Sequence, residues 1–307
     1  MRMGDFFTSL FRLDRENRQR RYGYAAGVIS IIVNIILSLV KFIMGMAVNS
    51  ISLITDSIHS LSDVATSLVV IIGFRISTKL PDHKHPFGHG RAERVVSIII
   101  ACMLIIVGFE FFIQGFHRMR NPVPVEFRWL VVLILFITVI CKEWLARFTF
   151  KLGRKIDSSA LRADAWHHRA DAVSTVLVII GFIMYRFGLY YVDGILSILI
   201  ACFIVYTGLG IIKESSSFLI GEAPSASFIN RIKMIALKCD GINDVHHIHV
   251  HDYGGKYEIT VHIRLKPDTL LDEAHKKATE VEECIKEFIE GAEVTVHVEP
   301  EGDDGHR

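Results

Sequence analysis

Two segments of the chain carry histidine and aspartate at matching positions. Six residues make up this repeat, and each member of the second set stands 108 residues after its counterpart: Asp56, His59, Asp63, Asp164, His167 and Asp171. A histidine and an aspartate four residues apart lie on one face of a helix. Two such faces turned toward each other supply two imidazole nitrogens and two carboxylate oxygens, which suit a four-coordinate Zn²⁺. Manganese, iron or cobalt can use the same ligands, because affinity alone separates first-row metals poorly.

The sequence around these segments predicts a membrane protein. Six apolar stretches, each long enough to cross about 30 Å of hydrocarbon, occupy residues 24–47, 51–75, 95–117, 128–148, 160–185 and 192–212. The second and fifth stretches contain the His–Asp segments and carry several ionisable residues. A carboxylate at the bilayer centre costs ~2.5–3.5 kcal/mol. Because each of the two matched His–Asp pairs carries this cost, they favour a metal site over a purely structural polar network between helices.

The repeat extends beyond the candidate ligands. Val70-Ile-Ile-Gly-Phe74 follows the first segment and Val178-Ile-Ile-Gly-Phe182 follows the second, again with an offset of 108 residues. The second and fifth spans run through the membrane in opposite directions, so the pattern indicates an inverted-topology repeat. Transporters with such repeats bind their substrate near the bilayer midplane, where the repeats meet.

The positive charges beside the spans predict the orientation. Lysine and arginine number sixteen on the side of the N-terminus and four on the opposite side, and positive charge favours the cytoplasm. Both termini are therefore expected in the cytoplasm. Residues 1–23 contain six arginines and no small-residue cleavage site, so we interpret them as a cytoplasmic segment and not as a signal peptide.

The last third of the chain differs from the rest in its charge. The net charge of +1 is the sum of +10 over residues 1–213 and −9 over residues 214–307. We expect a helix at 224–238, strands at 244–252, 256–266 and 292–299, and a second helix at 269–289. Asp252-Tyr-Gly-Gly255 is a hairpin turn signal. The predicted divisions are a cytoplasmic segment, a transmembrane domain, a soluble metal-binding and dimerisation domain, and a loose tail: 1–23, 24–213, 214–301 and 302–307.

Histidine is concentrated in the soluble part. Eight of the fifteen histidines lie beyond residue 240, which favours metal binding over a merely solvated face. Strict strand alternation places His247, His249 and His251 on one face and His246 on the other.

The overall composition excludes several classes of protein. A hydrophobic content of 51% excludes intrinsic disorder, and five cysteines without a CxxC motif exclude a disulfide scaffold. The near-zero net charge argues against a nucleic-acid binder. The sequence thus predicts an α-helical membrane protein of six transmembrane helices with an inverted repeat, followed by a small α+β cytoplasmic domain of order αββαβ.

Taken together, the chain resembles the cation diffusion facilitator family of divalent-metal transporters. The resemblance rests on six spans, on the paired His-x3-Asp motifs, on the loop Pro81-Asp-His-Lys-His-Pro-Phe-Gly-His-Gly-Arg-Ala-Glu93 and on the αββαβ domain. It implies a homodimer in the plasma membrane that exports metal from the cytoplasm in exchange for protons. It also implies a ferredoxin-like, metallochaperone-like fold for the soluble domain.

The resemblance also implies roles for individual residues. His59, Asp63, His167 and Asp171 match the transport site, and a histidine at position 59 is similar to the zinc-transporting branches. A second site in the cytoplasmic loop matches Asp82, His85 and His89. A regulatory metal site in the soluble domain matches His246, His262, His275, His297 and Glu299. Arg91 occupies a basic position that pairs with an aspartate after span six in some members; here Gly221 and Glu222 stand there.

The expected function is therefore proton-coupled efflux of Zn²⁺, with Zn²⁺ also acting as the regulatory ion. Alternatives within the family are Mn²⁺, Fe²⁺, Co²⁺ or Cd²⁺ export. An intramembrane metalloenzyme is a different class, but no HExxH motif occurs and four protein ligands would close the shell. A passive cation channel is a third class, and channels tend to build their filters from symmetric rings of like groups.

Overall fold

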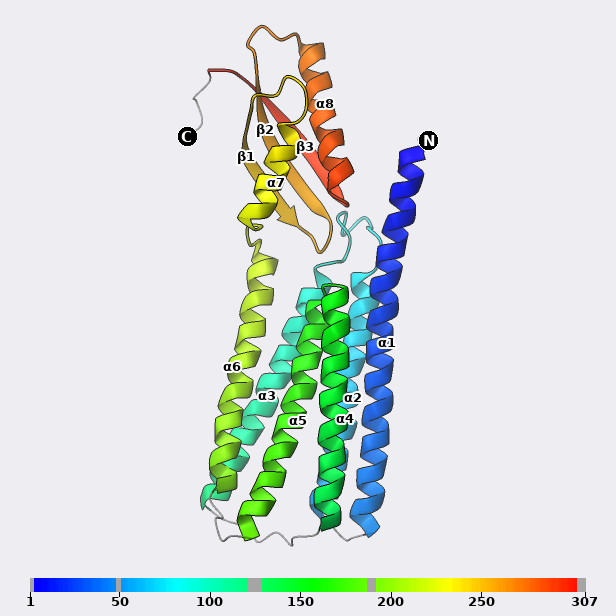
Figure 1. The fold of residues 1–307 in the computed structure, drawn as a ribbon, viewed down its shortest axis with the longest axis vertical. Coiled ribbons are helices and arrows are strands. Elements are labelled where there is room, and N and C mark those ends of the chain that lie inside the picture. Colours follow the sequence, from blue (N-terminus) through cyan, green and yellow to red (C-terminus); the bar gives the residue numbers. More distant parts are fainter. Residues whose placement is uncertain (1–2, 48–50, 121–128, 187–191, 303–307) are drawn as a thin grey trace. The chain divides into compact units, whose positions relative to one another are not determined.

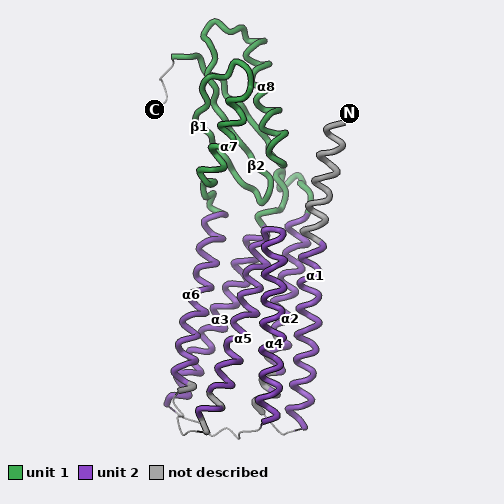
Figure 2. The backbone as a smooth tube through the Cα atoms, in the orientation of Figure 1, with its two compact units in different colours: residues 1–15, 79–91, 219–307 green, residues 16–78, 92–218 purple. Residues whose placement is uncertain are grey.

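The computed structural model describes residues 3–47, 51–120, 129–186 and 192–302. The chain divides into two compact units, shown in different colours in Figure 2. One unit comprises residues 16–78 and 92–218, which form a helical bundle. The other comprises residues 1–15, 79–91 and 219–307, which include the small α+β domain.

All six apolar stretches are helical (Figure 1). The helices are α1 Met3–Ala47, α2 Ile51–Ser77, α3 Ala92–Arg120, α4 Trp129–Lys155, α5 Ser159–Arg186 and α6 Val192–Ile220. In the described part of the chain, four helices are long and apolar enough to span a membrane: α1, α3, α4 and α6. Helices α2 and α5 are as long, with 27 and 28 residues. They carry the ionisable His–Asp segments, which lower their hydropathy.

The burial pattern of the bundle suits a bilayer. Large apolar side chains such as Leu39, Ile113 and Phe109 face outward, whereas polar and charged side chains such as Lys41 and Lys142 are buried inside. A water-soluble bundle would have the reverse arrangement, because burial of apolar surface stabilises it. Helix α5 packs against α2, α3 and α4, so the two helices of the repeat lie together inside the bundle.

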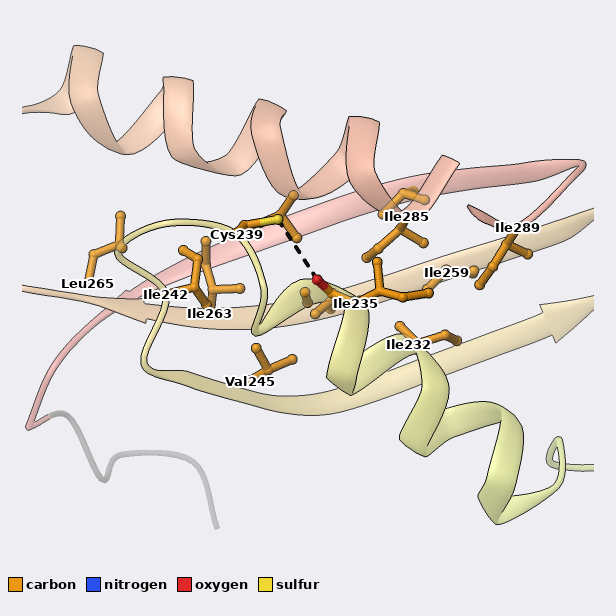
Figure 3. Packing of buried hydrophobic residues seen from close by; sticks show 14 residues of the cluster. Ile232, Ile235, Cys239, Ile242, Val245, Ile259, Ile263, Leu265, Ile285 and Ile289 are labelled. Carbon is orange, nitrogen blue, oxygen red and sulfur yellow. Dashed lines mark hydrogen bonds between the residues drawn. The ribbon is translucent and has the colours of Figure 1, made fainter. Parts of the chain in front are cut away.

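The soluble domain has the predicted element order. It comprises α7 Ala226–Ala236, β1 Asp244–Asp252, β2 Tyr257–Leu265, α8 Leu271–Phe288 and β3 Ala292–Pro300. Its sheet has the order β1-β2-β3, with β1 and β2 antiparallel and β2 and β3 parallel. Both helices cover one face, where Ile232 and Ile235 of α7 meet Ile259 and Ile263 of β2 and Ile285 of α8 (Figure 3). The domain therefore has its own hydrophobic core.

The predicted hairpin turn is confirmed. It joins β1 to β2, and Gly254 and Gly255 adopt φ angles of 88° and 94°, which a side chain would disfavour. The Asp252 carboxylate accepts hydrogen bonds from both glycine N–H groups, at 2.7 and 3.0 Å. These contacts hold the turn and fix the register of the two strands.

The prediction that His246 and His249 lie on opposite faces of β1 was wrong, because the strand contains a bulge. The register shifts between His246 and His249, where His247 has a φ of 44°. One extra residue reverses the alternation of side chains beyond it. His246 therefore lies opposite His262, and His249 lies opposite Thr260. His246 and His249 thus share the face of the sheet that the helices leave open.

Candidate metal sites

The transmembrane bundle brings together three of the four predicted transport ligands. Asp63 comes from α2, and His167 and Asp171 come from α5. The ligand atoms of the three side chains all lie within 4.8 Å of one another. His167 Nε2 lies 3.5 Å from Asp63 Oδ1 and 3.8 Å from Asp171 Oδ2. All three side chains are buried, so the repeat places a nitrogen and two carboxylates in one enclosed site.

The imidazole of His167 supports a ligand role. Its two ring nitrogens are buried and have no hydrogen-bond partner among the described residues, although buried polar atoms are normally hydrogen-bonded. A metal ion between the imidazole and the carboxylates would complete this arrangement. The His59 side chain lies outside the described residues. Its place on α2, four residues before Asp63, is the one that the repeat predicts.

Lys142 is a member of this site that sequence reasoning missed. It comes from α4, and its Nζ donates hydrogen bonds to Asp63 Oδ2 at 2.6 Å and to Asp171 Oδ2 at 2.8 Å. The signal was present in the sequence, because Lys142 interrupts the apolar stretch 128–148. A lysine inside a membrane span is costly and usually pairs with an acidic group.

A second polar cluster surrounds His168. Its Nε2 lies 3.2 Å from Ser30 Oγ of α1 and 3.4 Å from Asp164 Oδ2, one turn earlier on α5. His168 and Asp164 are completely buried. The sequence assigns neither of them a ligand role. The structure places them on a different side of α5 from His167 and Asp171, and His168 joins α5 to α1.

The predicted loop site is also assembled. His89 Nε2 lies 3.5 Å from Asp82 Oδ2, and His85 Nδ1 lies 3.6 Å from Asp82 Oδ1. The backbone N–H groups of His85 and Lys84 donate to Asp82 Oδ1 at 2.8 and 2.9 Å. The bond from His85 is the main reason why the pKa of the Asp82 carboxyl is lowered. Asp82 is therefore available as an anionic ligand near neutral pH.

The loop that carries this site packs on the β1–β2 turn. Phe87 stacks on Tyr253 with ring centroids 4.4 Å apart, and Gly90 lies against Gly254 with no room for a side chain. Arg91 donates from Nε to the Asp252 carbonyl at 3.0 Å and covers the Tyr253 ring. Arg91 thus anchors the loop to the hairpin of its own chain. The structure describes no bond between it and Glu222.

The open face of the soluble sheet carries the third cluster. Glu299 of β3 is its centre, and its carboxylate accepts hydrogen bonds from His262 Nδ1 at 2.8 Å and from His246 Nε2 at 3.0 Å. His297 lies opposite His262 in the parallel pairing of β2 and β3, with ring centroids 4.7 Å apart. The hydrogen bond from His262 is the main reason why the pKa of Glu299 falls to about 2.

Two residues depart from the predicted composition of this cluster. His247 belongs to it, since its ring centroid is 5.0 Å from that of His246 and 5.3 Å from that of His262. The bulge brings it there, and simple alternation gives no signal for it. His275 is exposed on α8, whose buried side chains cover the opposite face of the sheet. Its role as a ligand stays a prediction.

The chain has relatives along most of its length. It is 35% identical over 266 residues to an uncharacterized transporter of Methanocaldococcus jannaschii, covering 87% of this chain and 93% of that one. It is 29% identical to the manganese efflux system protein MneP of Bacillus subtilis, covering 94% and 98%. It is 24% identical to the cation-efflux pump FieF of Citrobacter koseri, covering 90% and 92%.

Among solved structures, a chain of CzrB in a zinc form aligns with 28% of this chain and 98% of its own, at 25% identity and a TM-score of 0.26. Two family descriptions match the sequence. Residues 27–220 match the cation efflux transmembrane domain, and residues 224–301 match the cation efflux protein cytoplasmic domain. The chain therefore belongs to the cation diffusion facilitator family, as a multi-pass membrane transporter for divalent cation efflux with a cytoplasmic C-terminal domain.

Proposed function

We propose that the protein exports a first-row divalent metal, with Mn²⁺ or Fe²⁺ ahead of Zn²⁺, from the cytoplasm across the plasma membrane in exchange for protons. The observation that carries this proposal is the convergence of Asp63 with His167 and Asp171 inside the bundle. His59 is proposed as the fourth ligand from its position in the repeat. Family membership excludes the metalloenzyme interpretation, and the enclosed site inside one chain favours a carrier over a channel.

The relatives guide the choice of metal. MneP is named as a manganese efflux protein, and a second relative in Bacillus subtilis, MneS, carries the same description at 28% identity. Carboxylates suit Mn²⁺, and imidazole suits Fe²⁺ and Zn²⁺. The zinc preference that His59 suggested has no comparable support among these relatives. Zinc and the other divalent ions are therefore alternative substrates, ranked after Mn²⁺ and Fe²⁺.

Proton coupling follows from the ligand chemistry. A metal binds ionised aspartate and neutral histidine, so metal binding and protonation of the ligands exclude each other. Movement of α2 and α5 relative to their neighbours would expose the site to the two sides of the membrane in turn. Protons on the outer side would then displace the metal, and the inward proton gradient would drive export.

The soluble domain is proposed as a sensor in a homodimer. On the open face of its sheet, three histidines lie around Glu299, and all of these side chains belong to the soluble domain. Metal bound there between two copies would tighten the dimer and bias the transport domains. The cytoplasmic location of both termini, predicted from the charge distribution, places this sensor on the side from which metal is exported.

Transport by reconstituted vesicles tests the proposal. Purified protein in vesicles is supplied with Mn²⁺, Fe²⁺, Co²⁺, Zn²⁺ or Cd²⁺, with and without a pH gradient. We expect proton-dependent uptake of Mn²⁺ or Fe²⁺ that Asp63→Asn abolishes. Asp157→Asn is the matched control, because the Asp157 side chain is 84% exposed. Metal movement that is insensitive to the pH gradient, or undiminished in Asp63→Asn, would overturn the proposal.

A further inference from the structure

Lys142 has its ammonium group inside the proposed transport site. Its side chain is 2% exposed, and the side chains of Asp63 and Asp171 are 4% and 6% exposed. The Nζ atom lies at hydrogen-bond distance from one oxygen of each carboxylate. It thus bridges α2 and α5, the two helices that the metal is proposed to bridge. The lysine itself stands on α4, outside the repeat.

The ammonium and a metal ion compete for the same atoms. Asp171 Oδ2 accepts the lysine hydrogen bond at 2.8 Å and also lies 3.8 Å from His167 Nε2. A metal bound to His167 and both aspartates would lie within a few ångströms of the ammonium. Two cations at such a short distance repel each other strongly in a buried site. The ammonium must therefore leave the carboxylates before a metal can take them.

We propose that Lys142 is a tethered counter-cation of the transport site, which neutralises Asp63 and Asp171 between transport events and is displaced by each incoming divalent metal. The inference rests on the proposed function, because it assigns a competitor to the same site. The lysine keeps its charge throughout and only changes position. Its flexible four-carbon stem suits such movement, which the planar and rigid guanidinium of an arginine would suit less.

This arrangement has two consequences for transport. Two bare carboxylates are costly in a low-dielectric interior, so a tethered cation stabilises the site while no metal is bound. It also selects for ionic charge. A monovalent ion that replaces the ammonium gains no additional attraction to the carboxylates, whereas a divalent ion does. Lys142 would therefore reject Na⁺ and K⁺ and lower the affinity for the metal, which favours its release.

Metal binding by the full-length protein tests the inference. Mn²⁺ affinity is measured by titration calorimetry for wild type, Lys142→Met and Lys142→Arg. Each protein is compared with its Asp63→Asn counterpart, so that metal held by the loop and cytoplasmic sites cancels. Lys151→Met is the matched control, because Lys151 stands on the same helix and is exposed. Manganese efflux from vesicles is measured in parallel for all variants.

We expect Lys142→Met to bind Mn²⁺ roughly tenfold more tightly than wild type, and to gain more thermal stability from Mn²⁺. Lys142→Arg keeps the positive charge and should bind Mn²⁺ no more tightly than wild type, and Lys151→Met should stay close to wild type in affinity. Mn²⁺ binding by Lys142→Met that is equal to or weaker than that of wild type would overturn the inference. Manganese efflux by wild type would still leave the proposed function intact in that case. A Lys142→Met protein that fails to fold even in saturating Mn²⁺ would also overturn it, because the metal should replace the ammonium. Absence of Asp63-dependent binding and efflux in wild type would instead refute the proposed function.

Discussion

His167 and His168 are neighbours in the sequence but belong to different sites. His167 points to the proposed transport site, with Nε2 3.5 Å from Asp63 Oδ1. His168 points to α1, with Nε2 3.2 Å from Ser30 Oγ. Successive residues of a helix are about 100° apart around its axis, so two adjacent histidines can serve two sides of α5. Their different surroundings predict different effects of the same substitution.

Replacement of His167 should impair transport. His167→Gln removes the imidazole nitrogen that faces both carboxylates, and we expect Mn²⁺ uptake into vesicles to fall at least about tenfold, since even residues that only support metal ligands contribute that much. The protein should still fold, because His167 makes no hydrogen bond with another described residue. Uptake at the wild-type rate would show that His167 is not a ligand.

Replacement of His168 should instead lower stability. His168→Leu removes the ring nitrogen that lies 3.2 Å from Ser30 Oγ and 3.4 Å from the buried Asp164 carboxylate, and the loss of such buried polar contacts costs about 1–3 kcal/mol. We expect a lower unfolding temperature and an unchanged order of preference among metals. Tryptophan fluorescence of the protein in detergent measures the unfolding temperature. His117→Leu on α3 is a suitable control, since His117 is exposed. A changed metal preference in His168→Leu would place His168 in the transport pathway.

The stability of the soluble domain should depend on whether the residue at position 247 can adopt the backbone conformation of the β1 bulge. His247 has a φ of 44°, which glycine adopts freely and a β-branched residue avoids. In residues 222–307, which contain the whole core of the soluble domain, His247→Val should lower the free energy of unfolding by about 1 kcal/mol or more relative to His247→Gly. Urea unfolding measures the difference. Equal stability of the two variants would mean that position 247 is not held in this conformation.

Glu299 should make the soluble domain sensitive to acid. Its pKa falls from 4.5 to about 2 in the folded state, so its stabilising contribution is fully present above pH 4.5 and is lost as the pH falls toward 2. Wild type should therefore exceed Glu299→Gln in unfolding free energy at pH 5, and the gap should narrow as the pH falls below 4.5. Glu301→Gln, at an exposed position, should show no such narrowing.

Much of this protein is determined by local sequence patterns. Apolar stretches of sufficient length form helices because every backbone polar group must be satisfied within the membrane, and all six stretches are helical. The spacing of His167 and Asp171 puts both on one helix face. The turn at Asp252–Gly255 follows from residues that tolerate its backbone angles. These features depend on neighbours along the chain, so they can be predicted from the sequence.

Other features were decided only by tertiary structure. The distance from Lys142 to Asp63 depends on how α4 and α2 are placed around α5, which no local pattern encodes. The bulge in β1 depends on pairing with β2, and this shift of one residue puts His246 and His249 on the same face, where strict alternation predicts opposite faces. Helix periodicity and strand alternation are short-range rules, whereas registry between elements is settled by packing over the whole domain. The sequence alone therefore identified the candidate metal ligands, and the fold revealed the cation that contacts them.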